Sequence, residues 1–331
     1  MSAPPALDDV LAAARVVDLP LRTRFRGVEH REALLVRGPA GWGEFAPFPE
    51  YGPAESARWL AAALEAAWTG WPPPRRTSVP VNATVPAVPA AQVPAVLARY
   101  DGCTTAKVKV AEAGQHLGDD VARVRAVREV LGPAGRIRVD ANAAWSVDDA
   151  ARALAALAPV GLEYAEQPCA TLEELAALRL RLARAGLDVP LAADESIRRA
   201  EDPLRVVAAG AADVVVLKVA PLAGVRPALA VAAACGLPVV VSSALDTSVG
   251  IAAGVALAAA LPELPFACGL GTVALLAADV VAEPRVPVAG ELAVGPVEPT
   301  GELLAGHAAA PERVRWWRER VAACWEHLPH G

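Results

Sequence analysis

The chain has 331 residues, of which 54% are hydrophobic and 21% charged, enough to build one large α/β unit and a smaller domain. Its net charge is −6 and no basic stripe stands out, which argues against nucleic acid as a partner. Residues 1–21 have no cationic start and their apolar stretches are broken by Asp and Pro, a pattern that fits neither a signal peptide nor a membrane span.

Residues 1–77 are predicted to form an α+β capping domain. Segments 14–25 and 30–47 are typical of strands joined by turns, and residues 53–68 are typical of a helix. The Pro-rich stretch 70–80 then marks a domain junction.

From residue 78 onward, short apolar runs alternate with Ala/Leu/Arg-rich stretches of helical spacing. Two of these helices are predicted at 118–132 and 171–186, the second opening with a capping box from Thr171 to Glu174. Eight strands are predicted, at 78–84, 104–110, 136–142, 162–168, 189–196, 213–220, 237–244 and 266–272. Eight such βα units favour a TIM-type (β/α)8 barrel over residues 78–272. A doubly wound sheet would need a Gly-rich phosphate turn after an early strand, and the sequence has none there.

The rest of the chain, residues 273–331, is predicted to supply the last barrel helix and a segment that returns to the cap. It contains a hairpin-like stretch at 286–297 and a helix at 311–328. Five cysteines stand singly, without a Cys-x-x-Cys pair, which predicts reduced thiols in a cytoplasmic protein and argues against a zinc site.

Ionisable residues stand at the C-terminal ends of five consecutive predicted strands. They are spaced by about one βα unit each: Lys109, Asp140, Glu166, Asp194 and Lys218. In a barrel these strand ends meet at one mouth, where barrel enzymes carry out their chemistry. Lys107 lies two residues before Lys109, so both side chains should point to the barrel interior.

The three carboxylates predict a divalent-metal site. Asp140, Glu166 and Asp194 would offer only oxygen ligands, which suits Mg²⁺ or Mn²⁺. Each acid alone could equally cap the following helix, but three on successive strands favour a shared role.

Lysine is rare in this chain, and its positions are informative. The chain has 31 Lys and Arg residues, of which only Lys107, Lys109 and Lys218 are lysine. Arginine keeps its proton in proteins, whereas the pKa of lysine can be lowered by burial and by nearby cations. The three lysines are therefore predicted to be titrating groups or compact cations. A Schiff-base role for Lys218 is disfavoured by the neighbouring acids.

This ordered set resembles the enolase superfamily, and within it the muconate-lactonizing-enzyme subgroup. The matching motifs are "KVK" (107–109), "DAN" (140–142), "EQP" (166–168), "DES" (194–196), the lone Lys218, and the segment 41–55 of the cap. The resemblance implies a (β/α)7β barrel under a cap and a Mg²⁺-dependent hydro-lyase of menaquinone biosynthesis, which converts a hydroxycyclohexadiene carboxylate into an aromatic product.

The resemblance also implies roles for the lysines. Lys109 would remove the proton α to the substrate carboxylate and then assist the loss of hydroxide. Lys218 would face it from the other side of the substrate, and Lys107 would tune Lys109. An N-acylamino-acid racemase or dipeptide epimerase is the alternative within the family, and a ligand-binding barrel without chemistry is the alternative outside it.

Further residues are predicted to surround this centre. Three would orient the ligands from behind: Asn142, Gln167 and Glu195. Five would contact a small-molecule carboxylate substrate: Ser242, Ser243, Gly269, Gly271 and the cap-loop residue Arg26. Turn or helix capping is an equal alternative for Asn142 and the serines, and a solvated loop position is the alternative for Arg26. No nucleic acid or membrane partner is expected, and the protein should be a monomer or weak homo-oligomer.

Overall fold

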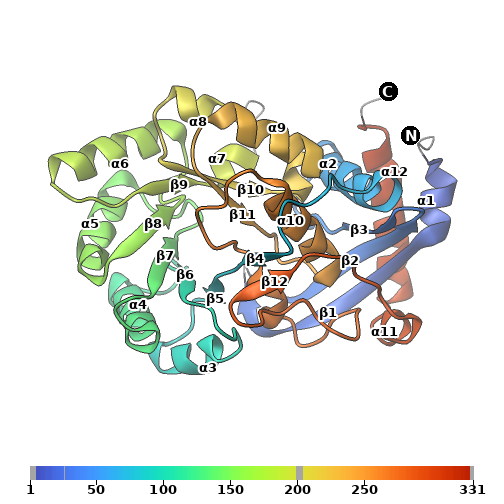
Figure 1. Ribbon diagram of the computed structural model, residues 1–331, viewed down its shortest axis with the longest axis horizontal. Coiled ribbons are helices and arrows are strands. Elements are labelled where there is room, and N and C mark those ends of the chain that lie inside the picture. Colours follow the sequence, from blue (N-terminus) through green and yellow to red (C-terminus); the bar gives the residue numbers. More distant parts are fainter. Residues whose placement is uncertain (1–4, 26, 199–203, 329–331) are drawn as a thin grey trace.

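The computed structural model describes residues 5–25, 27–198 and 204–328, which form a helix-wrapped barrel beside a smaller α+β cap (Figure 1). The predicted TIM-type architecture is confirmed. The barrel takes up the middle of the chain, and both described ends of the chain lie on the cap side.

The cap is built on a three-stranded antiparallel sheet in the order β1-β2-β3. Its elements are α1 (Leu7–Ala13), β1 (Ala14–Phe25), β2 (Val28–Gly38), β3 (Gly41–Phe45), α2 (Pro53–Leu64) and the π-helical turn η1 (Glu65–Thr69). Proline at the first position of α2 fits a helix start, where its missing N–H is not needed. The predicted strands and helix of this part are therefore present.

The C-terminal part of the chain returns to the cap. Helix α12 (Pro311–Trp325) buries Trp317, Val321 and Cys324 against Phe45 and Leu60 of the cap in one apolar cluster. The short helix α11 (Gly301–Gly306) precedes it. The C-terminal segment thereby completes the core of a domain that begins at the other end of the chain.

Seven parallel strands curl into the barrel wall. Their order is that of the sequence: β5 (Ala83–Val85), β6 (Thr105–Lys109), β7 (Arg136–Asp140), β8 (Leu162–Glu166), β9 (Leu191–Ala193), β10 (Val214–Lys218) and β11 (Val239–Ser242). The segment around Cys268 and Gly269 closes the wall, with a bridge to Val81 on one side and to Ser242 on the other.

Two strand predictions differ in detail from the structure. The eighth predicted strand forms only these two bridges and then turns into the 3₁₀ helix η5 (Gly271–Leu275), because its glycines offer little side-chain packing. The first predicted strand is split into β5 and β4 (Ser78–Pro80). β4 pairs antiparallel with β12 (Glu291–Ala293). The stretch 286–297, predicted to be hairpin-like, thus contains one strand, and that strand pairs with β4. Pro80 lacks the N–H needed to continue a central ladder.

Helices and short helical turns connect the strands on the outside. They are η2 (Ala90–Gln92), α3 (Val93–Leu97), α4 (Leu117–Leu131), α5 (Val147–Leu157), η3 (Ala158–Val160), α6 (Leu172–Arg184), α7 (Glu195–Arg198), α8 (Arg205–Ala208), η4 (Ala220–Leu222), α9 (Val225–Cys235) and α10 (Ser248–Ala260). The predicted capping box of α6 is confirmed: Thr171 Oγ1 accepts from Glu174 N, and Glu174 Oε2 accepts from Thr171 N.

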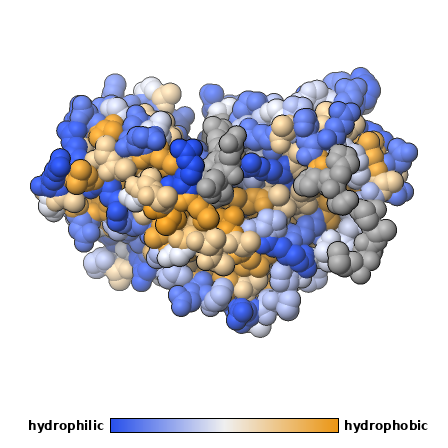
Figure 2. Space-filling view, turned by 90° about the horizontal axis from the view of Figure 1, so that it is seen from above, coloured by the Kyte–Doolittle hydropathy of each residue, from blue (hydrophilic) through white to orange (hydrophobic). Residues whose placement is uncertain are grey.

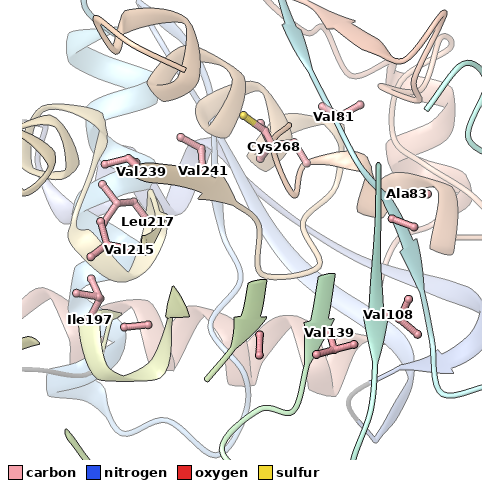
Figure 3. Packing of buried hydrophobic residues seen from close by; sticks show 14 of the residues in the cluster. Val81, Ala83, Val108, Val139, Ile197, Val215, Leu217, Val239, Val241 and Cys268 are labelled. Carbon is pink, nitrogen blue, oxygen red and sulfur yellow. The ribbon is translucent and has the colours of Figure 1, made fainter. Parts of the chain in front are cut away.

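Alternation along the strands separates the two faces of the wall. Val108 and Val139 point outward into the apolar layer beneath the helices, where Leu217 and Val241 also lie (Figure 3). Their neighbours in sequence therefore point into the barrel. This places Lys107, Lys109 and Asp140 on the interior side of β6 and β7.

Helix α10 lies between the barrel and the cap, which explains its composition. Its sequence is apolar or small all round, and nearly all its residues are buried. Ile251 and Leu257 belong to the barrel core, whereas Val249 packs with Trp42 and Ala46 of the cap. The helix is thus a contact element for both domains.

Exposed large hydrophobic side chains include Val130, Leu180 and Val288. Figure 2 shows a face on which hydrophobic residues gather near the middle and hydrophilic residues lie toward both ends. Within the described ranges no helix is both long and apolar enough to cross a lipid bilayer.

Candidate active site

The C-terminal ends of β6 to β10 bring six charged side chains to one mouth of the barrel. Pairing between strands fixes their heights: Lys109 lies opposite Asp140, Asp140 opposite Glu166, and Lys218 opposite Ser242. Asp194 directly follows β9. Lys107, Lys109, Asp140, Glu166, Asp194 and Lys218 are called the mouth cluster below.

Lysine ammonium groups join the carboxylates of this cluster. Lys107 Nζ lies 2.7 Å from Glu166 Oε1 and 3.3 Å from Asp140 Oδ2, so it bridges two acids. Lys109 Nζ donates to Asp140 Oδ2 at 2.5 Å. On the other side of the mouth, Lys218 Nζ donates to Asp194 Oδ2 at 2.5 Å. The structure therefore places Lys109 and Lys218 on different acids, with Glu166 between these acids in strand order.

The mouth cluster is withdrawn from solvent. The side chains of Lys107, Lys218 and Lys109 are 8%, 7% and 12% exposed. Charged groups in such surroundings interact far more strongly than they would in water, and their pKa values respond to one another.

The pKa values of the two lysines on β6 are shifted in opposite directions. Burial lowers the pKa of Lys109, and the adjacent Lys107 charge lowers it further, although Asp140 opposes the change. Burial also acts to lower the pKa of Lys107, but the charges of Glu166 and then Asp140 outweigh it and raise that pKa. Of the two lysines on β6, Lys109 therefore releases its proton more readily than Lys107.

The acids also differ from one another. Burial acts to raise the pKa of Asp140, but Lys109 and Lys107 hold it well below its usual range. Burial, followed by the charge of Asp140, raises the pKa of Glu166 to about 7. Among these acids, Glu166 is therefore the one whose charged form is disfavoured by the neighbouring carboxylates.

The donor set fits a hard divalent cation. The described side chains form no group of three or more His, Cys, Asp or Glu residues that could hold a metal ion, and each acid of the mouth cluster accepts a hydrogen bond from a lysine. Within the described part of the chain, buried Glu166 Oε2 has no hydrogen-bond partner. An oxygen-only set with an unpartnered buried carboxylate oxygen suits Mg²⁺ or Mn²⁺ rather than a soft metal.

Polar residues behind the acids hold them in place. Asn142 Oδ1 accepts from Lys109 Nζ at 2.6 Å, its backbone N donates to Asp140 Oδ1, and its Nδ2 donates to Glu195 Oε1 at 3.3 Å. Gln167 Oε1 accepts from the backbone N of Asp194 at 2.9 Å. Both Asn142 and Gln167 have a positive φ, so the backbone makes a sharp turn shortly after Asp140 and again directly after Glu166.

The last two wall segments add neutral polar groups. Ser243 Oγ donates to Gly269 O at 2.8 Å and lies 2.9 Å from Thr272 Oγ1, while Ser242 Oγ donates to Gly269 O at 3.4 Å. A Cβ at Gly269 would lie 2.5 Å from Ser242 Oγ, so this close approach requires glycine. The structure therefore brings Ser242, Ser243 and Gly269 together.

Gly271 is also confined, since a Cβ there would lie 2.9 Å from the carbonyl oxygen of Asn82. Thr272, the residue after Gly271, is not among the site residues predicted from the sequence, but the contact of its hydroxyl with Ser243 makes it part of this corner.

The end of cap strand β1 reaches the mouth cluster. The Phe25 ring centroid lies 5.3 Å from Lys109 Nζ, and Phe25 packs with Leu245 and Leu275 in a small apolar cluster. The sequence predicts a cap loop at Arg24, Phe25 and Arg26 that could close over the substrate, but Arg24 and Phe25 belong to the end of strand β1. The predicted substrate residue Arg26 lies outside the described residues.

Comparisons with known proteins place both parts of this chain. Residues 90–301 match the family model described as "Enolase C-terminal domain-like", and residues 16–67 match the model described as "Enolase N-terminal domain-like".

Curated relatives are similar over almost the whole chain. The o-succinylbenzoate synthase of Mycolicibacterium smegmatis is 62% identical over 321 residues, 97% of either protein. That of Thermobifida fusca is 60% identical over 317 residues, 95% of this chain and 97% of the relative.

Solved structures agree with the observed architecture. The muconate lactonizing enzyme from Pseudomonas fluorescens, complexed with muconolactone, superposes with a TM-score of 0.75 at 23% identity, covering 89% of this chain and 98% of that one. An isomerase from Streptomyces coelicolor A3(2) superposes with a TM-score of 0.71 at 26% identity, covering 91% of this chain and 96% of that one.

Proposed function

The chain belongs to the enolase superfamily, and we propose that it acts there as an o-succinylbenzoate synthase. It dehydrates 2-succinyl-6-hydroxy-2,4-cyclohexadiene-1-carboxylate to 2-succinylbenzoate in menaquinone biosynthesis, and is thus a divalent-metal-dependent carbon–oxygen lyase. The observation that carries the mechanism is the mouth cluster, in which lysines from two sides converge on buried acids.

Lys109 acts as the base and then as the acid. In its neutral form it takes the proton from the carbon α to the substrate carboxylate, and the C–H electron pair moves into that carboxylate as an enediolate. The same ammonium then protonates the departing hydroxyl; the C–O bond breaks, water leaves and the ring becomes aromatic. One residue performing both transfers gives a syn dehydration. The lowered pKa of Lys109, caused first by its burial, supplies the neutral form.

The other two lysines stabilise charge. Lys218, on the Asp194 side of the mouth, faces the substrate opposite Lys109 and compensates the negative charge of the enediolate. Lys107 is held between Glu166 and Asp140, where its charge favours the neutral form of Lys109. Asn142 fixes the Lys109 ammonium from the side of β7.

Asp140, Glu166 and Asp194 would hold a divalent cation, which we propose to be Mg²⁺, with Mn²⁺ as a substitute. When bound, this ion supplies positive charge that stabilises the substrate carboxylate as the α-proton is lost. Asn142 and Gln167 keep Asp140 and Asp194 oriented through the contacts described above, and Glu195 supports Asn142.

Ser242, Ser243 and the glycines 269 and 271 form the part of the mouth that receives the carboxylate groups of the substrate. Their hydroxyl and backbone groups lie together next to the strand that carries Lys218. Segment 269–271 carries no acid that could pair with an α-ammonium group, so nothing in it favours a dipeptide epimerase.

An absorbance assay tests the proposal, because aromatisation changes the ultraviolet spectrum of the substrate. We expect turnover of the hydroxycyclohexadiene carboxylate, loss of turnover after EDTA, and recovery after addition of Mg²⁺ or Mn²⁺. Activity that survives chelation would overturn the metal-dependent mechanism. Absence of turnover with both Mg²⁺ and Mn²⁺ would show that the proposed substrate is wrong.

A further inference from the structure

A buried glutamate of the cap is bonded to the barrel at the connection between β11 and α10. Glu44 lies on β3 and is 8% exposed. Thr247 N donates to both of its oxygens, at 3.3 Å and 3.2 Å, while Thr247 Oγ1 and Gly250 N donate to Oε2 at 2.5 Å and 3.0 Å. A cap side chain therefore satisfies the first turn of a barrel helix.

A buried arginine of the cap holds the same connection three residues earlier. Arg31 of β2 is 3% exposed; its Nε donates to Leu245 O at 2.9 Å and its Nη2 donates to Ala244 O at 3.3 Å and to Ala46 O. Leu245 has a φ of 64°, a conformation that costs a leucine free energy and needs support from its surroundings.

Glu44 and Asp246 lie close to the backbone of α10. A Cβ at Gly250 would lie 2.6 Å from Asp246 Cβ and 2.9 Å from Glu44 Cδ, so the two acids close over the helix backbone at this glycine. A cavity of about 30 Å³, room for one or two water molecules, is lined by Glu44, Asp246, Lys218 and Ser242 among others. The contact thus adjoins the mouth cluster directly.

We propose that Glu44 and Arg31 are positioning residues through which the cap sets the backbone of residues 243–247 and, with it, the hydroxyls of Ser242 and Ser243. This inference rests on the proposed function, in which these serines receive the substrate carboxylates. Substrate affinity then depends on a contact made at the far side of the loop, by residues that touch no substrate.

The chemistry of Glu44 supports a role that a plain apolar contact could not fill. Burial, followed by the charge of Asp246, raises the pKa of Glu44 to about 8, so the carboxyl is mostly protonated at neutral pH. Burying a carboxyl group between the cap and the barrel costs free energy unless hydrogen bonds compensate for the lost hydration. A protonated carboxyl has a carbonyl oxygen that accepts and an O–H that donates, and a glutamine amide of the same length likewise has an accepting oxygen beside a donor group.

Three variants test the proposal against a purely structural role. In Glu44→Ala, we expect KM and the dissociation constant of 2-succinylbenzoate, measured by calorimetry, to rise about tenfold, while kcat changes less than about twofold. Glu44→Gln should restore both values to within about threefold, because its amide oxygen can accept from Thr247 and Gly250.

Asp279→Ala is the matched control. Asp279 accepts hydrogen bonds from Ser248 N and Ser248 Oγ, in the first turn of the same helix, and from Val280 N, all outside residues 243–247. We expect it to lower the melting temperature and to leave KM and product affinity unchanged. Equal effects of Glu44→Ala and Asp279→Ala on KM would overturn the proposal, since both would then act only by loosening α10.

Arg31→Lys provides an independent arm should Glu44→Ala not fold. Lysine retains the charge but cannot reach Leu245 O and Ala244 O together, so KM should rise while kcat is retained. An unchanged KM in Arg31→Lys would contradict the proposal. Wild-type protein without turnover would instead refute the proposed function, and the product calorimetry would still separate the variants from the control.

Discussion

The barrel interior contains charged side chains at two levels, and only one of them uses lysine. Above lies the mouth cluster. Two residues earlier along β7 and β8 lie Arg138 and Tyr164, which with Glu163, Asn82 and Phe266 are called the floor cluster here. Arg138 Nε donates to Glu163 Oε2 at 2.5 Å and Nη1 donates to Asn82 Oδ1 at 3.0 Å, and its guanidinium lies over the rings of Tyr164 and Phe266.

The two clusters differ in what their cations can do. In the floor cluster a flat guanidinium is stacked on aromatic rings and bonded along its edge, and it cannot lose its proton. In the mouth cluster compact ammonium groups share acids, and Lys109 has a lowered pKa. The same strand alternation thus produces one layer with Arg and one layer with Lys, and we propose that only the second takes part in the reaction. Four substitutions and one control separate these roles.

Lys109→Arg should have the largest effect. It keeps the positive charge beside Asp140 but removes the group that can release a proton, so kcat should fall about a thousandfold. The absorbance assay at saturating substrate measures this directly. Product affinity and the melting temperature should stay close to those of the wild type. A variant that keeps more than about a tenth of wild-type kcat would mean that Lys109 serves only as a charge.

Arg138→Met tests the floor cluster. It leaves Glu163 with only Arg136 and removes the stacking on Tyr164, so the free energy of unfolding in urea should fall by about 3 kcal/mol. The pH dependence of kcat should not change.

Arg136→Met is the control for this change. The Arg136 side chain is 61% exposed and pairs with the same Glu163, so its loss should cost less than about 1 kcal/mol. A loss of turnover in Arg138→Met without a loss of stability would show that the floor cluster takes part in the chemistry.

Much of this organisation follows from the sequence, because strand period and βα spacing are local properties. Lys109, Asp140 and Lys218 could be assigned to one mouth since the carboxyl ends of parallel strands in a barrel share one end. The metal and base roles given to these residues remain predictions that the assays above address.

Contacts between distant segments could not be read in this way. Glu44 lies within the cap motif at 41–55, yet nothing local indicates that it caps a helix 203 residues later. The split of residues 78–84 into β4 and β5 likewise depends on pairing with β12. Phe25 contacts Lys109 only because β1 is long enough to reach the mouth.

Lys107→Arg makes the same exchange as the first variant, two residues earlier. If Lys107 is a permanent cation, an arginine can replace its charge but not its compact fit between Glu166 and Asp140, so kcat/KM should fall only about tenfold. The pH profile checks the assignment. Because the base acts in its neutral form, kcat/KM rises with pH through the lowered pKa of Lys109 and then levels off. This rise should persist in Lys107→Arg; its disappearance would place the titrating group at Lys107.

Tyr164→Phe should have the smallest effect and marks the boundary between the clusters. Tyr164 is fully buried two residues before Glu166, and in the described structure its hydroxyl has no hydrogen-bond partner. Removing this hydroxyl keeps the edge contact with Phe266 and the contact with Arg138, so the free energy of unfolding should stay the same or rise by up to about 1 kcal/mol. Urea unfolding measures this change, and kcat/KM should remain within about twofold of wild type. A clear loss of either quantity would show that the hydroxyl links the floor to Glu166, so that the two layers work as one.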